Sequence, residues 1–243
     1  MKFGIFSDVH ANLPALEAVL EFLNGKVEKY LCCGDIVGYG PHPNECVQKI
    51  AGINNVMCVV GNHDWGVLGL EDILKFNDLA SWAVKWTKEK LTGESVSFLM
   101  NLDYKLVGGD FIVVHGSLVD PLDQYVMDAE TYLPSARAQT RPILFNGHTH
   151  QPLYFKAAGG VVNFGAFIPG KAVQILPGSK YLINVGSVGQ PRDGNPKSAC
   201  VIYDNETKEA RLYRIEYDIS KTQNDMRMAG IPQELVERLA KGV

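Results

Sequence analysis

Short apolar runs that end abruptly in polar residues are the feature that most constrains this chain. In one of them, residues 56–60 are all apolar and are followed at once by Gly-Asn-His-Asp at residues 61–64. Such a run predicts a strand buried on both faces, and polar groups at its carboxyl end are what an open α/β sheet offers a ligand. Four further runs end in the same way, at residues 7–10, 34–35, 115–117 and 146–150. The sequence therefore predicts a ligand site built from five strand ends.

Helical patterns lie between these runs. The residues between Asn12 and Gly25 place their apolar side chains on one face, with Asn12 suited to cap the helix and Gly25 to stop it. Further helical patterns cover residues 44–51, 71–91, 94–100 and 232–240. In the longest of these, an apolar stripe around Trp82 is predicted to pack on the sheet. Residues 118–141 are polar and irregular with a helical patch, and they are long enough to cover a site.

After residue 150 the pattern changes to short strands separated by glycine and proline. The strands predicted for the whole chain cover residues 3–6, 30–33, 56–60, 105–107, 110–114, 143–145, 153–156, 161–164, 172–175, 181–185, 199–204 and 209–216. No internal repeat, low-complexity segment or linker interrupts the chain, so we expect an α/β fold with a single domain over residues 1–243.

Composition and charge limit the kinds of partner. Hydrophobic residues make up 46% of the chain and charged residues 21%, as in ordinary globular proteins. The formal net charge is −4 and there is no basic run, which argues against a nucleic-acid partner. The apolar run at residues 3–6 is too short for a signal sequence or a membrane span. The five cysteines are odd in number and lack zinc-knuckle spacing, so we expect reduced thiols in a cytoplasmic protein without a membrane partner.

The polar residues at the strand ends are of the types that bind metal ions. Five of the six histidines lie there, beside two aspartates and an asparagine. The set is Asp8, His10, Asp35, Asn62, His63, His115, His148 and His150. Seven oxygen and nitrogen donors without a thiolate suit borderline divalent ions such as manganese, iron or zinc. Seven is too many for one catalytic ion but fits two ions that share a carboxylate, an arrangement that predicts phosphoester hydrolysis.

The motifs also resemble those of a known family. Asp8-x-His10, Gly34-Asp35, Gly61-Asn62-His63-Asp64, His115-Gly116 and Gly147-His148-x-His150 together look like the motifs of the calcineurin-like metallophosphoesterases, in the family's order. Residues 184–194 resemble the small, single-domain prokaryotic phosphodiesterase branch. The resemblance implies a four-layer α/β/β/α sandwich with two mixed β-sheets and the metal site at the carboxyl ends of the strands.

The same resemblance implies a role for each motif residue. One ion would be bound by Asp8, His10 and His150, the other by Asn62, His115 and His148, with Asp35 between the two. His63 would be the general acid for the leaving oxygen or would stabilise the charge of the phosphorane, and Asp64 would orient its ring. The nucleophile would be a hydroxide that bridges the ions. The two divalent ions would be manganese, iron, zinc or nickel, with manganese favoured.

A few residues outside the motifs have two interpretations each. Arg192 lies in a Gly/Pro/Asn-rich loop and could bind a phosphate through its guanidinium, and a solvated surface role is the alternative. Asn12 could contact the substrate, but a helix cap explains it equally well. Tyr39 could line the site or pack in the core. His42, between two prolines, is predicted to be an exposed loop residue.

The predicted function is hydrolysis of a small phosphodiester of the nucleotide type. A phosphomonoesterase or a protein Ser/Thr phosphatase is the enzymatic alternative, and a non-catalytic scaffold on the same fold is a third. The presence of His63 and of all seven ligands argues against the scaffold. Monomer and homo-oligomer are both left open.

Overall fold

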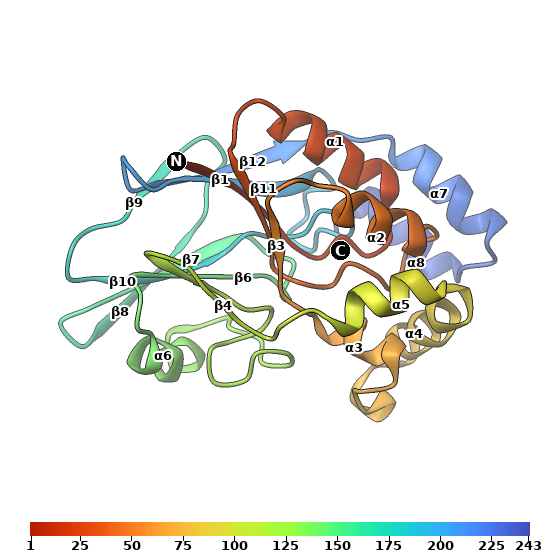
Figure 1. Ribbon diagram of the computed structural model, residues 1–243, viewed down its shortest axis with the longest axis horizontal. Coiled ribbons are helices and arrows are strands. Elements are labelled where there is room, and N and C mark those ends of the chain that lie inside the picture. The colour runs from red at the N-terminus through yellow and green to blue at the C-terminus, as the bar shows by residue number, and fades with distance from the viewer.

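Two six-stranded mixed sheets lie at the centre of the computed structural model, which describes residues 1–243 (Figure 1). In spatial order, the first sheet contains β3 (Val56–Cys58), β2 (Lys29–Cys32), β1 (Lys2–Phe6), β11 (Ser198–Asp204), β12 (Glu209–Ile215) and β9 (Ala172–Gln174). The second contains β4 (Leu106–Val107), β5 (Phe111–Val113), β6 (Ile143–Asn146), β10 (Lys180–Asn184), β7 (Leu153–Ala158) and β8 (Val161–Ala166).

Parallel pairing within each sheet decides where the polar strand ends meet. β1, β2 and β3 run parallel to one another in the first sheet, and β5, β6 and β10 do so in the second. The carboxyl ends of parallel strands lie at the same edge of their sheet. The polar residues that follow β1, β2, β3, β5 and β6 are therefore brought to one end of the molecule, as the sequence predicts.

The two sheets pack face to face around a shared core. Twenty buried residues form this core, including Ile5 and Val201 from the first sheet and Phe145 and Ile183 from the second. Burial of such apolar side chains is the main favourable contribution to folding. The two sheets therefore share one hydrophobic core.

Helices cover the outer faces of both sheets and complete the four predicted layers (Figure 1). They are α1 (Leu13–Leu23), α2 (Pro43–Ala51), α3 (Asn62–Leu68), the short 3-10 helix η1 (Ile73–Lys75), α4 (Asp78–Lys90), α5 (Gly93–Met100), α6 (Ala129–Ala138), α7 (Ile219–Met228) and α8 (Gln233–Lys241). The first sheet packs on side chains of α1 and α2, such as Leu16 and Ile50. The second packs on Tyr132 of α6.

Three expectations about the elements are wrong. β3 is an edge strand of three half-buried residues and is not buried on both faces; the fully buried residues of the predicted run, Val59 and Val60, follow it, and Val59 pairs with Asp103. The stripe around Trp82 packs on α7 and α8, next to Met226 and Leu235, and not on a sheet. α7 itself is missing from the sequence prediction, because Thr222 and Met226 are its only buried residues and leave almost no apolar periodicity.

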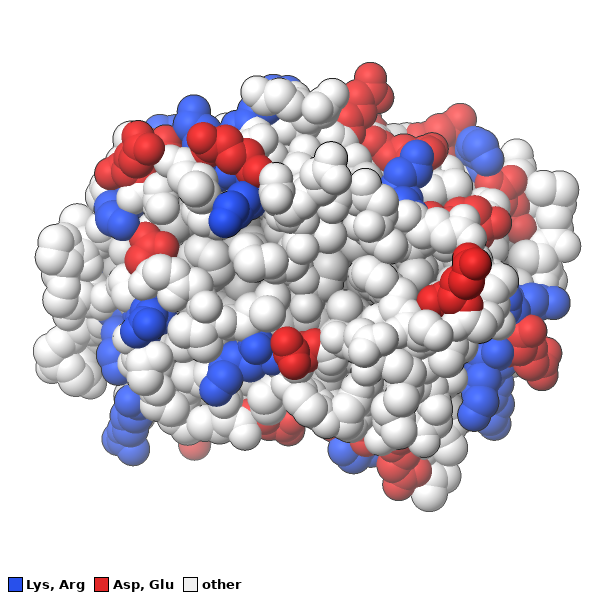
Figure 2. Space-filling model, in the orientation of Figure 1, with Lys and Arg blue, Asp and Glu red and all other residues white.

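The surface agrees with the mixed composition of the chain. On the face shown in Figure 2, basic and acidic side chains are interspersed and neither kind forms a continuous patch. All five cysteines are free. None of the helices has both the length and the apolar character needed to cross a membrane.

Candidate metal centre

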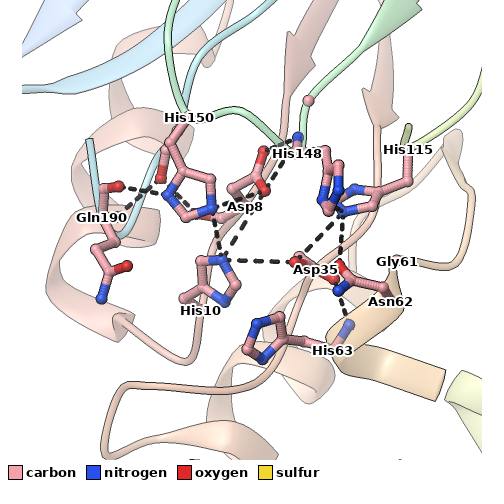
Figure 3. A network of polar contacts seen from close by, with 12 residues as sticks. Asp8, His10, Asp35, Gly61, Asn62, His63, His115, His148, His150 and Gln190 are labelled. Atoms are coloured by element: carbon pink, nitrogen blue, oxygen red, sulfur yellow. Dashed lines mark hydrogen bonds and ion pairs between the residues drawn. The ribbon is translucent and has the colours of Figure 1, made fainter. Parts of the chain in front are cut away.

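The structure brings all seven predicted metal ligands together at the carboxyl ends of the parallel strands (Figure 3). The first sheet supplies Asp8 and His10 after β1, Asp35 after β2, and Asn62 at the start of α3. The second supplies His115 after β5, and His148 and His150 after β6. Asn62 is half-buried and the other six are buried. The cluster therefore lies between the two sheets and takes residues from both.

The backbone at the cluster is held in an unusual conformation. Five of the seven predicted ligands have a positive φ although none is glycine: Asp8, His10, Asp35, His148 and His150. The left-handed region is sterically costly for such residues and is maintained only where the surrounding structure enforces it. The five residues follow β1, β2 and β6. Backbone strain concentrated in one place indicates a functional site.

Two glycines allow the strand ends to approach one another. A Cβ atom at Gly61 would overlap the backbone nitrogen and the carboxylate of Asp35. A Cβ atom at Gly147 would overlap the side chains of Ser7 and Asp8. No side chain other than hydrogen fits at either position, so these two glycines permit the close approach of the strand ends.

Backbone carbonyls fix which ring nitrogen of each histidine faces the cluster. The Nδ1 atoms of three rings lie near carbonyl oxygens: His10 near Val37 at 3.1 Å, His115 near Cys33 at 2.8 Å and His150 near Gln190 at 2.5 Å. A carbonyl only accepts hydrogen bonds, so each of these Nδ1 atoms carries a proton and donates it. Nε2 is therefore the nitrogen that faces the cluster in all three rings.

His148 has the opposite arrangement. Its Nε2 lies 3.0 Å from the carbonyl oxygen of Asp123, so it is Nε2 that donates and Nδ1 that faces the cluster. The Tyr125 ring stacks on the imidazole, with ring centroids 4.0 Å apart and planes 12° apart. Each of the four rings is thus oriented by a backbone carbonyl, which is the arrangement usual for metal-binding histidines.

The inward-facing atoms form two groups that share Asp35. In the first group, Asp8, His10, Asp35 and His150 offer atoms that all lie within 4.8 Å of one another. In the second, Asp35, His115 and His148 meet the same limit. The Asn62 Oδ1 atom lies 3.1 Å from His115 Nε2, which adds it to the second group. These are the two ligand sets that the resemblance implies, with the predicted carboxylate between them.

The electrostatics of the cluster favour a cation. Burial lowers the pKa of His10 and of His150, and it lowers the pKa of His148 to about 3, so these rings are neutral at pH 7. Burial also acts against His115, but the Asp35 carboxylate raises the pKa of that ring to about 9. Asp8 and Asp35 are buried, which by itself would raise their pKa. The neighbouring imidazoles nevertheless lower the pKa of both carboxylates, so both are ionised.

The donor atoms fit divalent metal ions. His10 Nε2 and His150 Nε2 lie 3.0 Å apart, and neither carries a proton, so two nitrogen lone pairs face each other in a buried site. Metal–nitrogen bonds of about 2.1 Å place adjacent ligands on one ion about 3 Å apart. His115 Nε2 and His148 Nδ1 have the same spacing, at 3.1 Å. In this second pair, the Nε2 proton of the charged His115 ring occupies the position that a bound cation would take.

His63 lies beside the cluster, and no hydrogen bond fixes its ring. Its backbone N–H donates to Asp35 Oδ1 at 2.9 Å, whereas its ring Nδ1 is buried without a hydrogen-bond partner. The rings of Tyr39 and Phe76 hold it, with centroids 4.5 and 5.1 Å away. Burial, with a contribution from the charge of Arg192, lowers the pKa of His63 to about 4. The ring is therefore neutral at pH 7 in the absence of ions.

Asp64 does not contact the His63 ring, so the expectation that it orients this ring is not supported. Asp64 Oδ1 accepts backbone N–H groups from Ile36 and Val37, and its Oδ2 accepts that of Gly61. Burial raises the pKa of Asp64 to about 7, while the three N–H groups favour its ionised form. Its contacts connect the loop after β2 to the start of α3, which places Asp35 next to Asn62.

The two residues predicted to bind substrate differ in their surroundings. Arg192 lines the cleft above the cluster, has no carboxylate partner, and is held by Gln190 Oε1 at 2.8 Å and by the Tyr39 ring. Asn12 is buried, caps α1 through the N–H of Ala15, and donates to the Gly189 carbonyl. The geometry keeps Arg192 available to an anion, and it favours the helix cap as the role of Asn12.

The structure also tests the interpretations of Tyr39 and His42. Tyr39 is buried and lines the cleft at the same time, so both of its interpretations hold. His42 is half-buried and its Nε2 lies 3.0 Å from Asp225 of α7, so the expectation of an exposed loop residue is wrong. The reason is that the unpredicted helix α7 covers this loop.

The cleft above the cluster contains residues that the sequence did not single out. It has a volume of about 150 Å³ and is lined by Tyr39, Asn62, His63, Lys75, Phe76, Asn77, Ala80, Asp123, Tyr125, His148 and Arg192. The predicted cover, residues 118–141, reaches the cleft only through Asp123 and Tyr125, while α6 packs on the far side of the second sheet. An aromatic residue within a polar segment was the one signal that pointed to Tyr125.

Comparison with known proteins identifies the family. Residues 1–208 match the profile of the calcineurin-like phosphoesterase superfamily domain. The chain belongs to the calcineurin-like phosphoesterase superfamily. This membership confirms the predicted family and makes the protein a metal-dependent phosphoesterase.

Individual relatives extend the match over most of the chain. The protein MJ0912 of Methanocaldococcus jannaschii is 37% identical, with 98% of this chain and 97% of the relative covered. The phosphodiesterase YfcE of Escherichia coli K12 is 26% identical, with 82% of this chain and 85% of the relative covered. A metallophosphoesterase from Sphaerobacter thermophilus, whose crystal structure is known, is 40% identical in sequence. The two structures align with a TM-score of 0.91, covering 100% of this chain and 99% of that chain. The predicted fold class is thereby confirmed.

Proposed function

We propose that this phosphoesterase uses two divalent ions to hydrolyse a small phosphodiester of the nucleotide type. The observation that carries the proposal is the pairing of inward-facing imidazole nitrogens, His10 with His150 and His115 with His148, around a shared Asp35 carboxylate. Two buried clusters of this kind, in contact through one carboxylate, are suited to a pair of ions.

The ligands of the two ions would be those of the two clusters. One ion would be held by Asp8, His10 and His150, the other by Asn62, His115 and His148, with Asp35 shared between them. When bound, the ions would act as Lewis acids toward the phosphoryl oxygens and would lower the pKa of the water that serves as the nucleophile. Manganese is the favoured ion, with iron, zinc and nickel as the alternatives, because the donors are imidazole and oxygen without thiolate.

Two side chains in the cleft would act on the substrate directly. The neutral ring of His63 would present an N–H to the leaving oxygen and donate a hydrogen bond to the charge that develops there; it carries no second proton to transfer as a general acid. The guanidinium of Arg192, whose Nη2 donates to Gln190 and whose Nε has no hydrogen-bond partner, would bind a non-bridging phosphate oxygen. Tyr39 and Phe76 restrict the His63 ring, and so keep its position in the cleft constant.

The shape of the cleft supports a small phosphodiester. Its volume of about 150 Å³ suits a phosphoryl group with a compact ester group. The exposed ring of Tyr125 offers a stacking surface to an aromatic ester group such as a nucleobase. Interspersed surface charges on the face in Figure 2 support a small-molecule partner over a nucleic acid. YfcE, the relative from Escherichia coli, is named a phosphodiesterase.

The test is hydrolysis by metal-stripped protein, with and without added Mn²⁺, of bis(p-nitrophenyl) phosphate and of p-nitrophenyl phosphate. We expect turnover that depends on Mn²⁺ and is faster with the diester, together with two bound ions per chain by elemental analysis. Faster turnover of the monoester would move the assignment to a phosphomonoesterase. A single bound ion at full activity would contradict the use of two ions.

A further inference from the structure

An ion pair connects the two walls of the cleft at its mouth. One wall consists of α3, η1 and the start of α4, and the other of residues 123–125 with His148. Lys75 Nζ on the first wall lies 2.7 Å from Asp123 Oδ2 on the second. Lys75 donates a hydrogen bond to Asp123, and this contact, together with the one to Glu71, raises the pKa of the lysine.

The two walls differ in how firmly they are held. The Asp123 side is fixed, because its carbonyl accepts the hydrogen bond of His148 and the adjacent Tyr125 ring stacks on the same imidazole. The Lys75 side is exposed: the side chain of Lys75 is 54% accessible and neighbouring Leu74 is 86% accessible. Opening the mouth therefore requires only that Lys75 rotate away, while His148 and the metal ligands stay in place.

The space below this ion pair is small. The cleft of about 150 Å³ accommodates a phosphoryl group with one compact ester group, whereas pockets for nucleotide-sized ligands are typically about 300 Å³ or more. A diester with a larger ester group must extend past Lys75 and Asp123. The same pair is too weak to exclude such a substrate altogether, since exposed ion pairs shift an equilibrium by at most about five-fold.

We propose that Lys75 and Asp123 determine substrate specificity, because their ion pair selects phosphodiesters by the size of the ester group that remains on the phosphate. Small diesters reach the site with the pair formed, and large ones require it to be broken. The observed affinity for a large substrate is then reduced by the fraction of molecules in which the pair is open. This inference rests on the proposed phosphodiesterase function.

The test compares two diesters that share a leaving group. Methyl p-nitrophenyl phosphate carries a small retained group, and the p-nitrophenyl ester of thymidine 5′-monophosphate carries a large one. We expect Lys75→Met and Asp123→Asn each to raise the ratio of kcat/KM for the nucleoside diester over the methyl diester by about two- to five-fold. The metal content of both variants should equal that of the wild type.

The two substitutions separate the ion pair from simple charge attraction. Lys75→Met removes a positive charge and Asp123→Asn a negative one. The two diesters carry the same charge, so attraction of an anionic substrate predicts opposite changes of kcat/KM in the two variants and an unchanged ratio. Loss of the pair predicts the same rise of the ratio in both variants. Glu71→Gln is the matched control, since Glu71 pairs with the same lysine at 2.8 Å without crossing the cleft. It should leave the ratio unchanged.

Salt provides an independent measurement. Raising NaCl from about 0.05 to 0.5 M weakens exposed ion pairs, so the ratio should rise in the wild type and stay constant in Lys75→Met. Opposite effects of the two substitutions, or an unchanged ratio in either of them, would overturn the proposal. Failure of the wild type to hydrolyse both diesters with Mn²⁺ would instead contradict the proposed function, so the two failures are distinguishable.

Discussion

The protonation of His115 in the metal-free protein gives the sharpest test of the site. His115 is fully buried, yet the Asp35 carboxylate, whose Oδ2 lies 3.4 Å from its Nε2, raises the pKa of the ring from 6.5 to about 9. The other three imidazoles of the cluster have a lowered pKa and are neutral. One charged ring among four is therefore expected between pH 7 and 9.

The sign and size of the effect follow from linkage. A group whose pKa is raised on folding stabilises the fold below its unfolded pKa, and this contribution is lost as the pH rises through the folded value. For His115 the window runs from pH 6.5 to about 9, and the contribution is about 3 kcal/mol. This contribution of His115 to the free energy of unfolding of the metal-free protein should be lost across the window, and its difference from Asp35→Asn measures it.

Nitrogen-detected NMR of the imidazoles, after removal of ions with a chelator, measures both protonation and tautomer. We expect one ring to titrate near pH 9, His10 and His150 to carry their proton on Nδ1, and His148 to carry it on Nε2. In Asp35→Asn, the ring of His115 should titrate well below its wild-type value of about 9, because burial then acts without the Asp35 carboxylate. A wild-type His115 that titrates near 6.5, or an Nε2-protonated His10, would refute the electrostatic account of the centre.

Three further predictions concern single side chains. His63→Ala should reduce kcat by about 10²- to 10⁴-fold while two ions stay bound, and unchanged turnover would defeat the role assigned to this ring. Asn12→Ala should lower the free energy of unfolding by about 1–2 kcal/mol without raising KM, because its hydrogen bonds are to the start of α1, to Gly189 and to Thr222; a raised KM at unchanged stability would restore the substrate-binding interpretation. Gly61→Ala should weaken metal binding in calorimetric titration, because its Cβ would displace Asp35; wild-type affinity would show that the strand ends are not held as closely as described.

The positions of the site residues were readable from the sequence because apolar runs mark where buried strands end. Asp8, His115 and His150 each follow such a run, and parallel pairing brings the ends of these strands to the same edge of their sheets. The conformation of these residues was not readable, because a positive φ at Asp8 or His150 is imposed by contacts with other loops and not by local sequence. The same is true of the tautomers, which depend on carbonyls far away in the chain.

The errors in the fold have a common physical origin. An apolar run such as residues 56–60 shows that a segment is covered, but not whether sheet partners or helices cover it. A stripe such as that around Trp82 shows that a helix has a packing face, but not which element it meets. The role expected of Asp64 failed for a related reason, since proximity to His63 in sequence did not translate into contact between the side chains.

The division of ligands between the two sheets links metal binding to the integrity of the whole molecule. Each cluster joins residues that follow β1, β2 or β3 to residues that follow β5 or β6, so a bound ion would cross-link the first sheet to the second. An unfolded chain has no such site, and saturation at about one hundred times the dissociation constant would add about 2.7 kcal/mol to the free energy of unfolding. The cell's supply of divalent metal would then govern how long the folded enzyme survives heat and proteolysis, in addition to how fast it turns over.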